Sequence, residues 1–137
     1  MTDGIDGIEG GCLCGRVRYR LRQGEAMASI CHCATCRRAA GAQSVAWATV
    51  PAAAFAWTGA APESHVSSPG VVRTHCAACG TSLTYQSEED SIDVTLASLD
   101  DPEAIPPTAE LWLSHRLSWE PVDPARPAFP RGPGDDD

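Results

Sequence analysis

The chain has 137 residues, which fits one domain, and it carries a formal net charge of −8. All ten basic residues are arginine, so there is no lysine for a Schiff base or a phosphate-binding loop. This acidity argues against nucleic acid as a partner, because phosphate binding relies on basic surface. No apolar run approaches the roughly 20 residues that cross a bilayer, so no membrane segment is expected.

The first ten residues are rich in glycine and aspartate and are expected to form a loose lead-in. They lack the basic start and apolar centre of a secretion signal, which favours a cytoplasmic location. Thiols there are kept reduced, so clustered cysteines are more often metal ligands or catalysts than disulfides. The odd count of seven cysteines also prevents complete internal pairing.

Short segments with β-branched or aromatic residues follow one another along the chain, and several alternate polar and apolar side chains. In one of them Ile92, Val94 and Leu96 fall on the same face. A turn is expected at Ser67–Gly70, where proline and glycine are adjacent. We expect strands at seven places: Arg16–Leu21, Val45–Val50, Ala54–Trp57, Val71–Thr74, Leu83–Tyr85, Ser91–Leu96 and Glu110–Leu113.

Helical periodicity is weak throughout the sequence. Glu25–Ile30 and Thr35–Ala40 are each expected to form a short helical turn at most. From Pro121 onward the chain is rich in proline and ends in three aspartates, which is typical of irregular coil. The sequence therefore predicts one mainly β domain over residues 1–137, with a core at about 8–130 and an acidic, proline-rich C-terminal tail.

The seven cysteines fall into three tight groups: Cys12-Leu13-Cys14, Cys31-His32-Cys33-Ala34-Thr35-Cys36 and Cys76-Ala77-Ala78-Cys79-Gly80. A Cys-x-x-Cys turn lets two sulfurs converge on one metal ion, and a following glycine relieves crowding in the loop. Structural zinc usually has four protein ligands, whereas catalytic zinc has three and an exchangeable position. Seven thiolates fill one four-ligand site and leave three.

Ligand counting therefore divides the cysteines between two zinc ions. The outer pairs would form a closed structural site with an apparent binding energy on the order of 10 kcal/mol; they are Cys12, Cys14, Cys76 and Cys79. The middle loop would hold a second, open site on Cys31, Cys33 and Cys36. One structural zinc with spare thiols, a redox-active Cys-x-x-Cys pair and merely buried cysteines are the alternatives.

Three polar residues next to the middle cysteines are candidates for substrate binding. His32 lies between two cysteines, where the side chain of an extended segment points away from its neighbours, so a supporting or substrate-facing role is expected rather than ligation. Arg37 and Arg38 follow Cys36, and guanidinium groups suit the carboxylates of a thiol such as glutathione. The alternatives are a structural role for the histidine and a solvated face for the arginines.

Aromatic residues give a weaker signal. Trp47 and Phe55 would line a pocket next to the open site or, as is more common on strands, belong to the core. Trp57, Trp112 and Trp119 have less claim to the site.

Taken together, these motifs resemble the family of glutathione-dependent formaldehyde-activating enzymes, which includes the centromere protein V type. The resemblance covers about residues 8–130. Any one cysteine pair would be weakly specific, whereas the combination is specific to this family. It rests on five segments: Gly10–Gly15, Cys31–Arg38 with Gly41 after it, Cys76–Gly80, Leu96–Pro102 and Glu110–Leu113.

The resemblance implies a β-tent fold of antiparallel sheets organised around zinc. It also implies structural zinc on the outer cysteine pairs and a more labile zinc on the middle three, in agreement with the ligand count. The implied activity joins formaldehyde to glutathione to give S-hydroxymethylglutathione, formally a carbon–sulfur lyase reaction in reverse. Because three thiolates already give the complex a net negative charge, we favour capture of a thiol over strong activation of the carbonyl.

Three classes of function follow from the sequence. The first is a zinc enzyme that acts on a small-molecule thiol–aldehyde adduct, and the second is a non-catalytic zinc scaffold that binds a protein. The third is a nucleic-acid-associated module, as the centromere branch suggests, which the acidity and the absence of lysine disfavour. A composition rich in Ala, Arg, Gly and Pro points to a GC-rich bacterial source.

Overall fold

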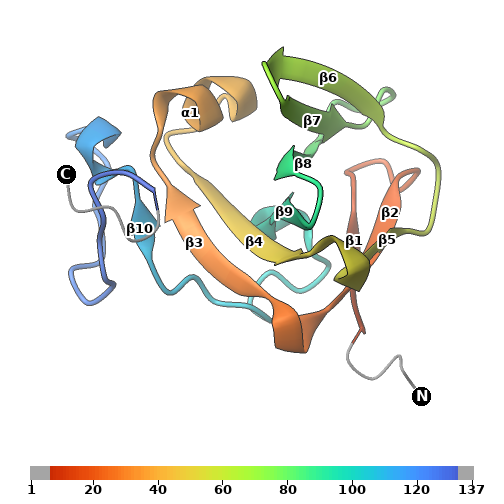
Figure 1. Cartoon of the computed structure of the whole chain (residues 1–137), viewed down its shortest axis with the longest axis horizontal. Coiled ribbons are helices and arrows are strands. Elements are labelled where there is room, and N and C mark those ends of the chain that lie inside the picture. The colour runs from red at the N-terminus through yellow and green to blue at the C-terminus, as the bar shows by residue number, and fades with distance from the viewer. Residues whose placement is uncertain (1–6, 133–137) are drawn as a thin grey trace.

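The computed structural model describes residues 7–132, which form two β-sheets and one short α-helix (Figure 1). The smaller sheet is antiparallel with the order β1-β2-β5, made of β1 Gly7–Gly11, β2 Arg18–Arg22 and β5 Phe55–Trp57. The larger sheet has the order β10-β3-β4-β9-β8-β7-β6. Its strands are β3 Met27–Cys31, β4 Val45–Pro51, β6 Glu63–Ser68, β7 Val71–His75, β8 Ser82–Glu88, β9 Ser91–Thr95 and β10 Glu110–Leu111. The prediction of a mainly β fold is confirmed.

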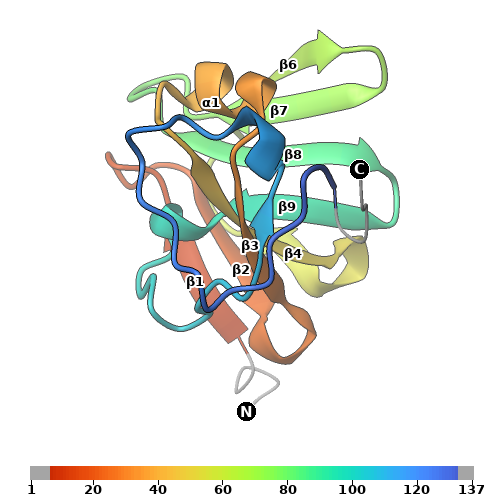
Figure 2. The same cartoon turned by 90° about the vertical axis from the view of Figure 1, so that its left-hand side faces the viewer.

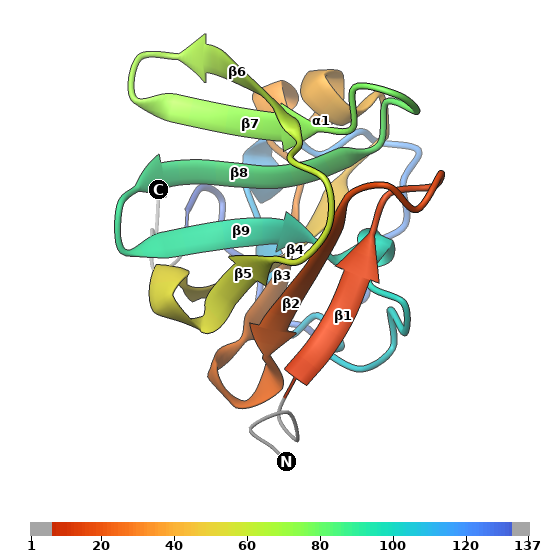
Figure 3. The ribbon, with the colours of Figure 1, turned by 90° about the vertical axis from the view of Figure 1, so that its right-hand side faces the viewer.

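One hydrophobic core lies between the two sheets, where the smaller sheet crosses the larger one (Figure 3). Tyr19 and Leu21 of β2 point into this core, and the arginines that alternate with them point outward. Ala48 on β4 and Val94 on β9 meet them from the larger sheet. Burial raises the pKa of Tyr19 to about 12, while its hydroxyl lies 2.6 Å from the Ser98 hydroxyl. The alternation read from the sequence thus describes one buried face of each sheet.

The larger sheet curls, so that α1 (Ala34–Ala40) beyond the end of β3 and the β6–β7 hairpin at the sheet edge both lie at the top of Figure 1. The C-terminal segment runs past β10 on the outside of the sheet (Figure 2). The segment from Pro121 to residue 132 is irregular, as predicted, yet it is anchored, because Phe129 N–H donates to Glu110 O at 2.9 Å. Within residues 7–132 no helix has the length and apolarity needed to span a bilayer.

Two local expectations from the sequence are wrong. Gly7–Gly10 belong to β1 rather than to a loose lead-in, whose residues 1–6 lie outside the described part of the chain. Glycine is required at position 10 because a Cβ on this residue would approach Ser98 O to 2.6 Å. The expected helical turn at Glu25–Ile30 is strand β3 from Met27 onward, since β4 and β10 pair with it on both sides. Short apolar runs do not separate helix from strand by periodicity alone.

Other segments refine the expectations. The short helical turn at Thr35–Ala40 is confirmed in α1. Strand β6 was not anticipated, because it is a polar edge strand with exposed residues throughout and has no buried face to mark it. Strand β10 is only two residues long and pairs with β3 in parallel, whereas the other pairs are antiparallel.

Candidate functional site

The cysteines form two separate clusters, in each of which the sulfur atoms all lie within 4.8 Å of one another. The first consists of Cys12, Cys14, Cys76 and Cys79, and the second of Cys31, Cys33 and Cys36. This is the division that ligand counting predicts. Each cluster is able to hold a metal ion.

The four-cysteine cluster joins two loops that come from different sheets. Cys12 and Cys14 lie between β1 and β2 of the smaller sheet, and Cys76 and Cys79 lie between β7 and β8 of the larger one. Backbone hydrogen bonds tighten both loops, with Val17 N–H donating to Cys12 Sγ at 3.3 Å and Cys79 N–H donating to Cys76 Sγ at 3.4 Å. Such donors favour thiolate ligands because they stabilise negative charge on sulfur.

Thr81 links the two loops of this cluster beyond the sulfurs themselves. Its hydroxyl oxygen accepts a hydrogen bond from Leu13 N–H at 3.0 Å, which leaves the hydroxyl proton free to donate to Cys79 Sγ at 3.3 Å. The Thr81 hydroxyl, with help from its backbone N–H, lowers the pKa of Cys79 to about 5. Thr81 therefore favours the thiolate form of Cys79 that metal binding requires.

The three-cysteine cluster lies on one short segment at the end of β3. Cys31 is the last residue of the strand, Cys33 caps α1, and Cys36 lies in the first turn of that helix. Cys33 Sγ accepts a hydrogen bond from Cys36 N–H at 3.3 Å and lies 3.2 Å from the Thr35 hydroxyl. Hydrogen bonds from the neighbouring Cys31 and Cys36 thiols hold the pKa of Cys33 well below its usual range.

Arg73, on strand β7, also reaches this second cluster. Its Nη2 lies 3.9 Å from Cys36 Sγ, its guanidinium stacks over the Tyr85 ring at 4.8 Å, and its Nε donates to Ser67 at 3.1 Å. A guanidinium at this distance offsets part of the negative charge of three thiolates. The contact depends on the curl of the sheet, which brings β7 back toward α1.

The geometry of the four-cysteine cluster fits metal ligation rather than disulfides. The Cys12–Cys14 and Cys14–Cys76 sulfur distances are 3.6 and 3.7 Å. A disulfide needs about 2.05 Å between sulfurs. Four sulfurs arranged tetrahedrally around zinc, each at about 2.3 Å, lie roughly 3.8 Å from one another. All seven cysteines are free thiols in the structure.

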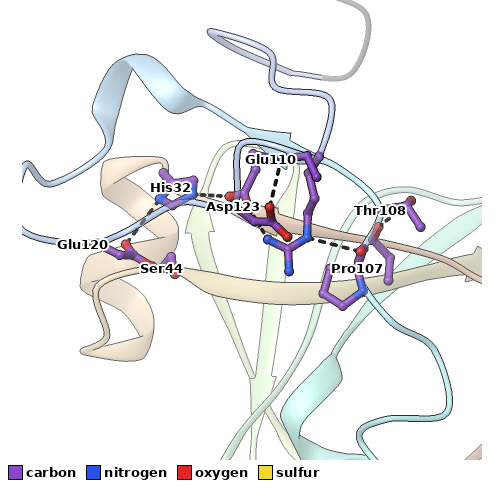
Figure 4. A network of polar contacts seen from close by, with 10 residues as sticks. His32, Ser44, Pro107, Thr108, Glu110, Glu120 and Asp123 are labelled. Carbon is purple, nitrogen blue, oxygen red and sulfur yellow. Dashed lines mark hydrogen bonds and ion pairs between the residues drawn. The ribbon is translucent and has the colours of Figure 1, made fainter.

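His32 lies outside both clusters, in a buried polar network (Figure 4). Only 1% of the residue is exposed, and its Nε2 lies 2.6 Å from Glu110 Oε1. Its Nδ1 faces Glu120 Oε1 at 3.4 Å, and the second oxygen of Glu120 accepts a hydrogen bond from Ser44 at 2.6 Å. Arg126 donates to Glu110 at 2.7 Å. The buried His32 side chain therefore anchors the segment from Cys31 to Cys33 to Glu110 on β10.

A pocket of about 710 Å³ lies on the face of the larger sheet that is turned away from the core. All three cysteines of the second cluster line one end of it, whereas none of the four-cysteine cluster does. Trp47, Tyr85 and Trp112 form aromatic walls, and Asp93 and Glu88 contribute carboxylates. This arrangement gives the second cluster an adjoining space for a small molecule.

The sequence analysis places some of these residues correctly and misses others. Trp47 lines the pocket, whereas Phe55 packs against Tyr19 in the core, with ring centroids 5.5 Å apart. Trp112, which has little claim from sequence, lines the pocket with its backbone in the left-handed region at φ 56°. Strained backbone of this kind is common at functional sites.

Arg37 and Arg38 lie in α1 and are not among the residues that line this pocket. Arg38 is exposed, while Arg37 is half-buried and its Nε has no hydrogen-bond partner among the described residues. Recognition of a carboxylate by these arginines stays a prediction. Glu110 and Arg73 were not singled out from sequence, because their roles depend on strand pairings that no local pattern encodes.

The described residues thus define a small, mainly β protein with one four-cysteine and one three-cysteine cluster, each able to hold a metal ion. A family model described as glutathione-dependent formaldehyde-activating enzyme matches residues 7–115, and the chain belongs to this family. The resemblance read from the cysteine motifs is confirmed.

The fold is also similar to a solved structure. The crystal structure of a Rhodobacter sphaeroides protein from a structural genomics programme has a TM-score of 0.58 and 25% identity. The match covers 68% of this chain and 88% of that one. Comparison with curated proteins gave no match.

Proposed function

We propose that the protein is a zinc-dependent enzyme of the carbon–sulfur lyase type that acts on a thiol–aldehyde adduct such as S-hydroxymethylglutathione. The observation that carries the proposal is the contact between the three-cysteine cluster and the pocket of about 710 Å³. A cluster that served stability alone would have no need of such a pocket. Membership of the family supports the same reaction class.

Cys31, Cys33 and Cys36 would hold the second zinc ion, which when bound supplies a position for an incoming thiol and lowers that thiol's pKa. In the direction of adduct formation, the thiol sulfur bonds to the carbonyl carbon, and the thiol proton passes to the carbonyl oxygen. The reverse reaction breaks the same carbon–sulfur bond. No oxidant or reductant is needed.

The residues around the cluster have separate tasks in this proposal. Trp47 and Tyr85, whose ring centroids are 6.0 Å apart, form an apolar wall that excludes water from the reacting sulfur. Arg73 offsets the charge that an additional thiolate would bring to a cluster of three. His32 is a positioning residue, because its Nε2 lies 2.6 Å from Glu110 Oε1 and its backbone N–H donates to Leu111 O at 3.0 Å.

The proposed partner is a small-molecule thiol or its adduct, and neither nucleic acid nor a membrane. The net charge of −8 and the absence of lysine support this choice. Arg37 and Arg38 would contribute only if a substrate extends from the pocket onto α1.

The test is the exchange rate between formaldehyde and its thiol adduct, measured by NMR exchange spectroscopy with purified protein of known zinc content. We expect acceleration by protein with two zinc equivalents, and loss of that acceleration in Cys33→Ser. The control is a metal assay on the same variant, which should retain one zinc equivalent and a cooperative unfolding transition.

Two outcomes would favour a non-catalytic scaffold instead. One is a wild-type protein that binds a single zinc equivalent and resists a chelator. The other is unchanged acceleration in the Cys33→Ser variant.

A further inference from the structure

The pocket beside the three-cysteine cluster has a charge pattern that the proposed reaction does not explain. Its lining includes two acids, Asp93 and Glu88, and no arginine or histidine. Glutathione carries two carboxylates and one ammonium group at neutral pH. The lining offers those carboxylates no cation, whereas its two acids suit the ammonium group.

Asp93 is the more informative of the two acids. It is half-buried, and the Thr49 hydroxyl donates to its Oδ1 at 2.6 Å. Within residues 7–132, no arginine or histidine forms an ion pair with it. Burial raises the pKa of Asp93, an effect that the Thr49 hydrogen bond only partly offsets. Partial burial without a cationic partner makes the charged form of this carboxyl group costly, and a cationic ligand would offset that cost.

The distance between Asp93 and the cysteine cluster determines how long a ligand must be. Cys31 pairs with Val45 on β4, and Asp93 pairs with Thr49 further along the same strand. Val45 and Thr49 are four residues apart, which corresponds to about 13 Å along a β-strand. A molecule with its sulfur at the cysteine cluster would therefore need an extended body to reach this carboxylate.

The walls between these two ends are aromatic. Trp47 and Tyr85 tilt toward each other with ring centroids 6.0 Å apart, and Trp112 lines the same pocket. Aromatic faces attract cations as well as apolar groups. Arg73 is not among the lining residues, and its guanidinium already contacts Cys36, Tyr85 and Ser67.

From this arrangement we infer that the pocket selects a thiol, or its aldehyde adduct, that has an extended apolar body and a positively charged group which binds Asp93. This inference rests on the proposed function, since it places the thiol end at the three-cysteine cluster. It narrows the substrate class of that function, because among thiol adducts it predicts a preference for those that carry a cationic group over those that carry carboxylates alone.

The test uses three probes of matched length: mercapto-octyl-trimethylammonium, mercapto-octanol and mercapto-octanoate. Their affinities for the zinc-loaded protein are measured by calorimetry and by the fluorescence of the tryptophans in the pocket. We expect the cationic probe to bind about tenfold more tightly than the neutral one, and the anionic probe to bind most weakly.

Asp93→Asn should remove most of the preference for the cationic probe while the neutral probe binds as before. Glu103→Gln, which removes an exposed acid outside the pocket lining, is the matched control and should preserve the preference. Glu88→Gln, at an exposed lining position, should weaken the preference partially and serves as the readout if Asp93→Asn fails to fold.

The failures of the two proposals are distinguishable. Equal affinities for the three probes, or tightest binding of the anionic one, would overturn the inference about charge and leave the thiol reaction intact. No binding of any thiol to protein with two zinc equivalents would overturn both.

Discussion

The four-cysteine cluster joins loops from two different sheets, whereas the three-cysteine cluster is contained in the segment from Cys31 to Cys36. The first ties together parts of the chain more than sixty residues apart, as the 3.7 Å contact between Cys14 and Cys76 shows. The second closes a short loop and borders a pocket. Metal bound at the first would chiefly stabilise the fold, and metal at the second would chiefly serve a ligand.

The largest expected effect is a loss of stability when a cysteine of the first cluster, but not of the second, is replaced. Cys76→Ser removes a buried ligand from the cluster that joins the sheets, so we expect loss of one metal ion and a fall in stability of at least about 5 kcal/mol. Denaturant unfolding with parallel metal analysis measures both. Cys33→Ser is the matched control, and it should also lose one metal ion but keep most of the stability. The comparison fails if the two variants are destabilised equally.

A smaller effect tests whether the second cluster depends on residues that do not touch the metal. Glu110→Gln leaves His32 and Arg126 without their buried carboxylate, which should cost about 3 kcal/mol of stability. We also expect about tenfold to a hundredfold weaker metal binding at the three-cysteine cluster. The first is measured by denaturant unfolding and the second by chelator competition.

The exposed Glu103→Gln serves as the control for Glu110→Gln and should change neither quantity. Loss of stability with unchanged metal affinity would show that the buried network supports the fold alone. The four-cysteine cluster should keep its metal in every case, because Glu110 does not contact it.

The division of the cysteines was predictable because it rests on arithmetic and local spacing. Neither requires knowledge of strand pairing, since the open site is confined to one loop. The pocket was not predictable in the same way. Asp93 and Trp47 face it because β9 and β4 pair in a particular register, and a sequence alternation shows a strand's two faces without showing what covers each of them.

Some missed residues did leave a signal in the sequence. Thr35 and Thr81 each stand two residues after a cysteine, and in both places the hydroxyl lies within 3.3 Å of that sulfur. The repeated spacing would have identified both as partners of a thiolate. Arg73 left no such signal, because its contact with Cys36 depends on the curl of the whole sheet.

The repeated threonine provides the third test. Thr81→Val removes a hydroxyl that accepts from Leu13 and donates to Cys79, so stability should fall by about 1–2 kcal/mol. Thr35→Val removes an exposed hydroxyl with one sulfur partner and should cost less than about 0.5 kcal/mol. Thermal or denaturant unfolding of both variants measures the difference. Equal losses would show that the loops of the first cluster are not joined through Thr81.

The smallest expected effect concerns two glycines, each of which follows one of the cysteine clusters and has a positive φ. Gly80 follows the last cysteine of the first cluster with φ at 85°, and Gly41 ends α1 after the second with φ at 67°. A Cβ would meet no atom within 4 Å at either position, so alanine introduces backbone strain without a clash. Each substitution should therefore cost about 1 kcal/mol.

The two glycine variants should nevertheless differ in metal binding. The N–H of Gly80 donates to Cys76 O at 2.8 Å, a hydrogen bond that closes the cysteine loop of the first cluster. Backbone strain at Gly80 would distort this loop, so Gly80→Ala should weaken metal binding there. Gly41 N–H bonds to Arg37 O, one turn beyond the ligands of the second cluster, so Gly41→Ala should leave metal affinity unchanged. Chelator competition distinguishes the two. A matched loss of affinity in Gly41→Ala would mean that the end of α1 and the cysteine loop move as one unit, so that the second cluster is held as rigidly as the first.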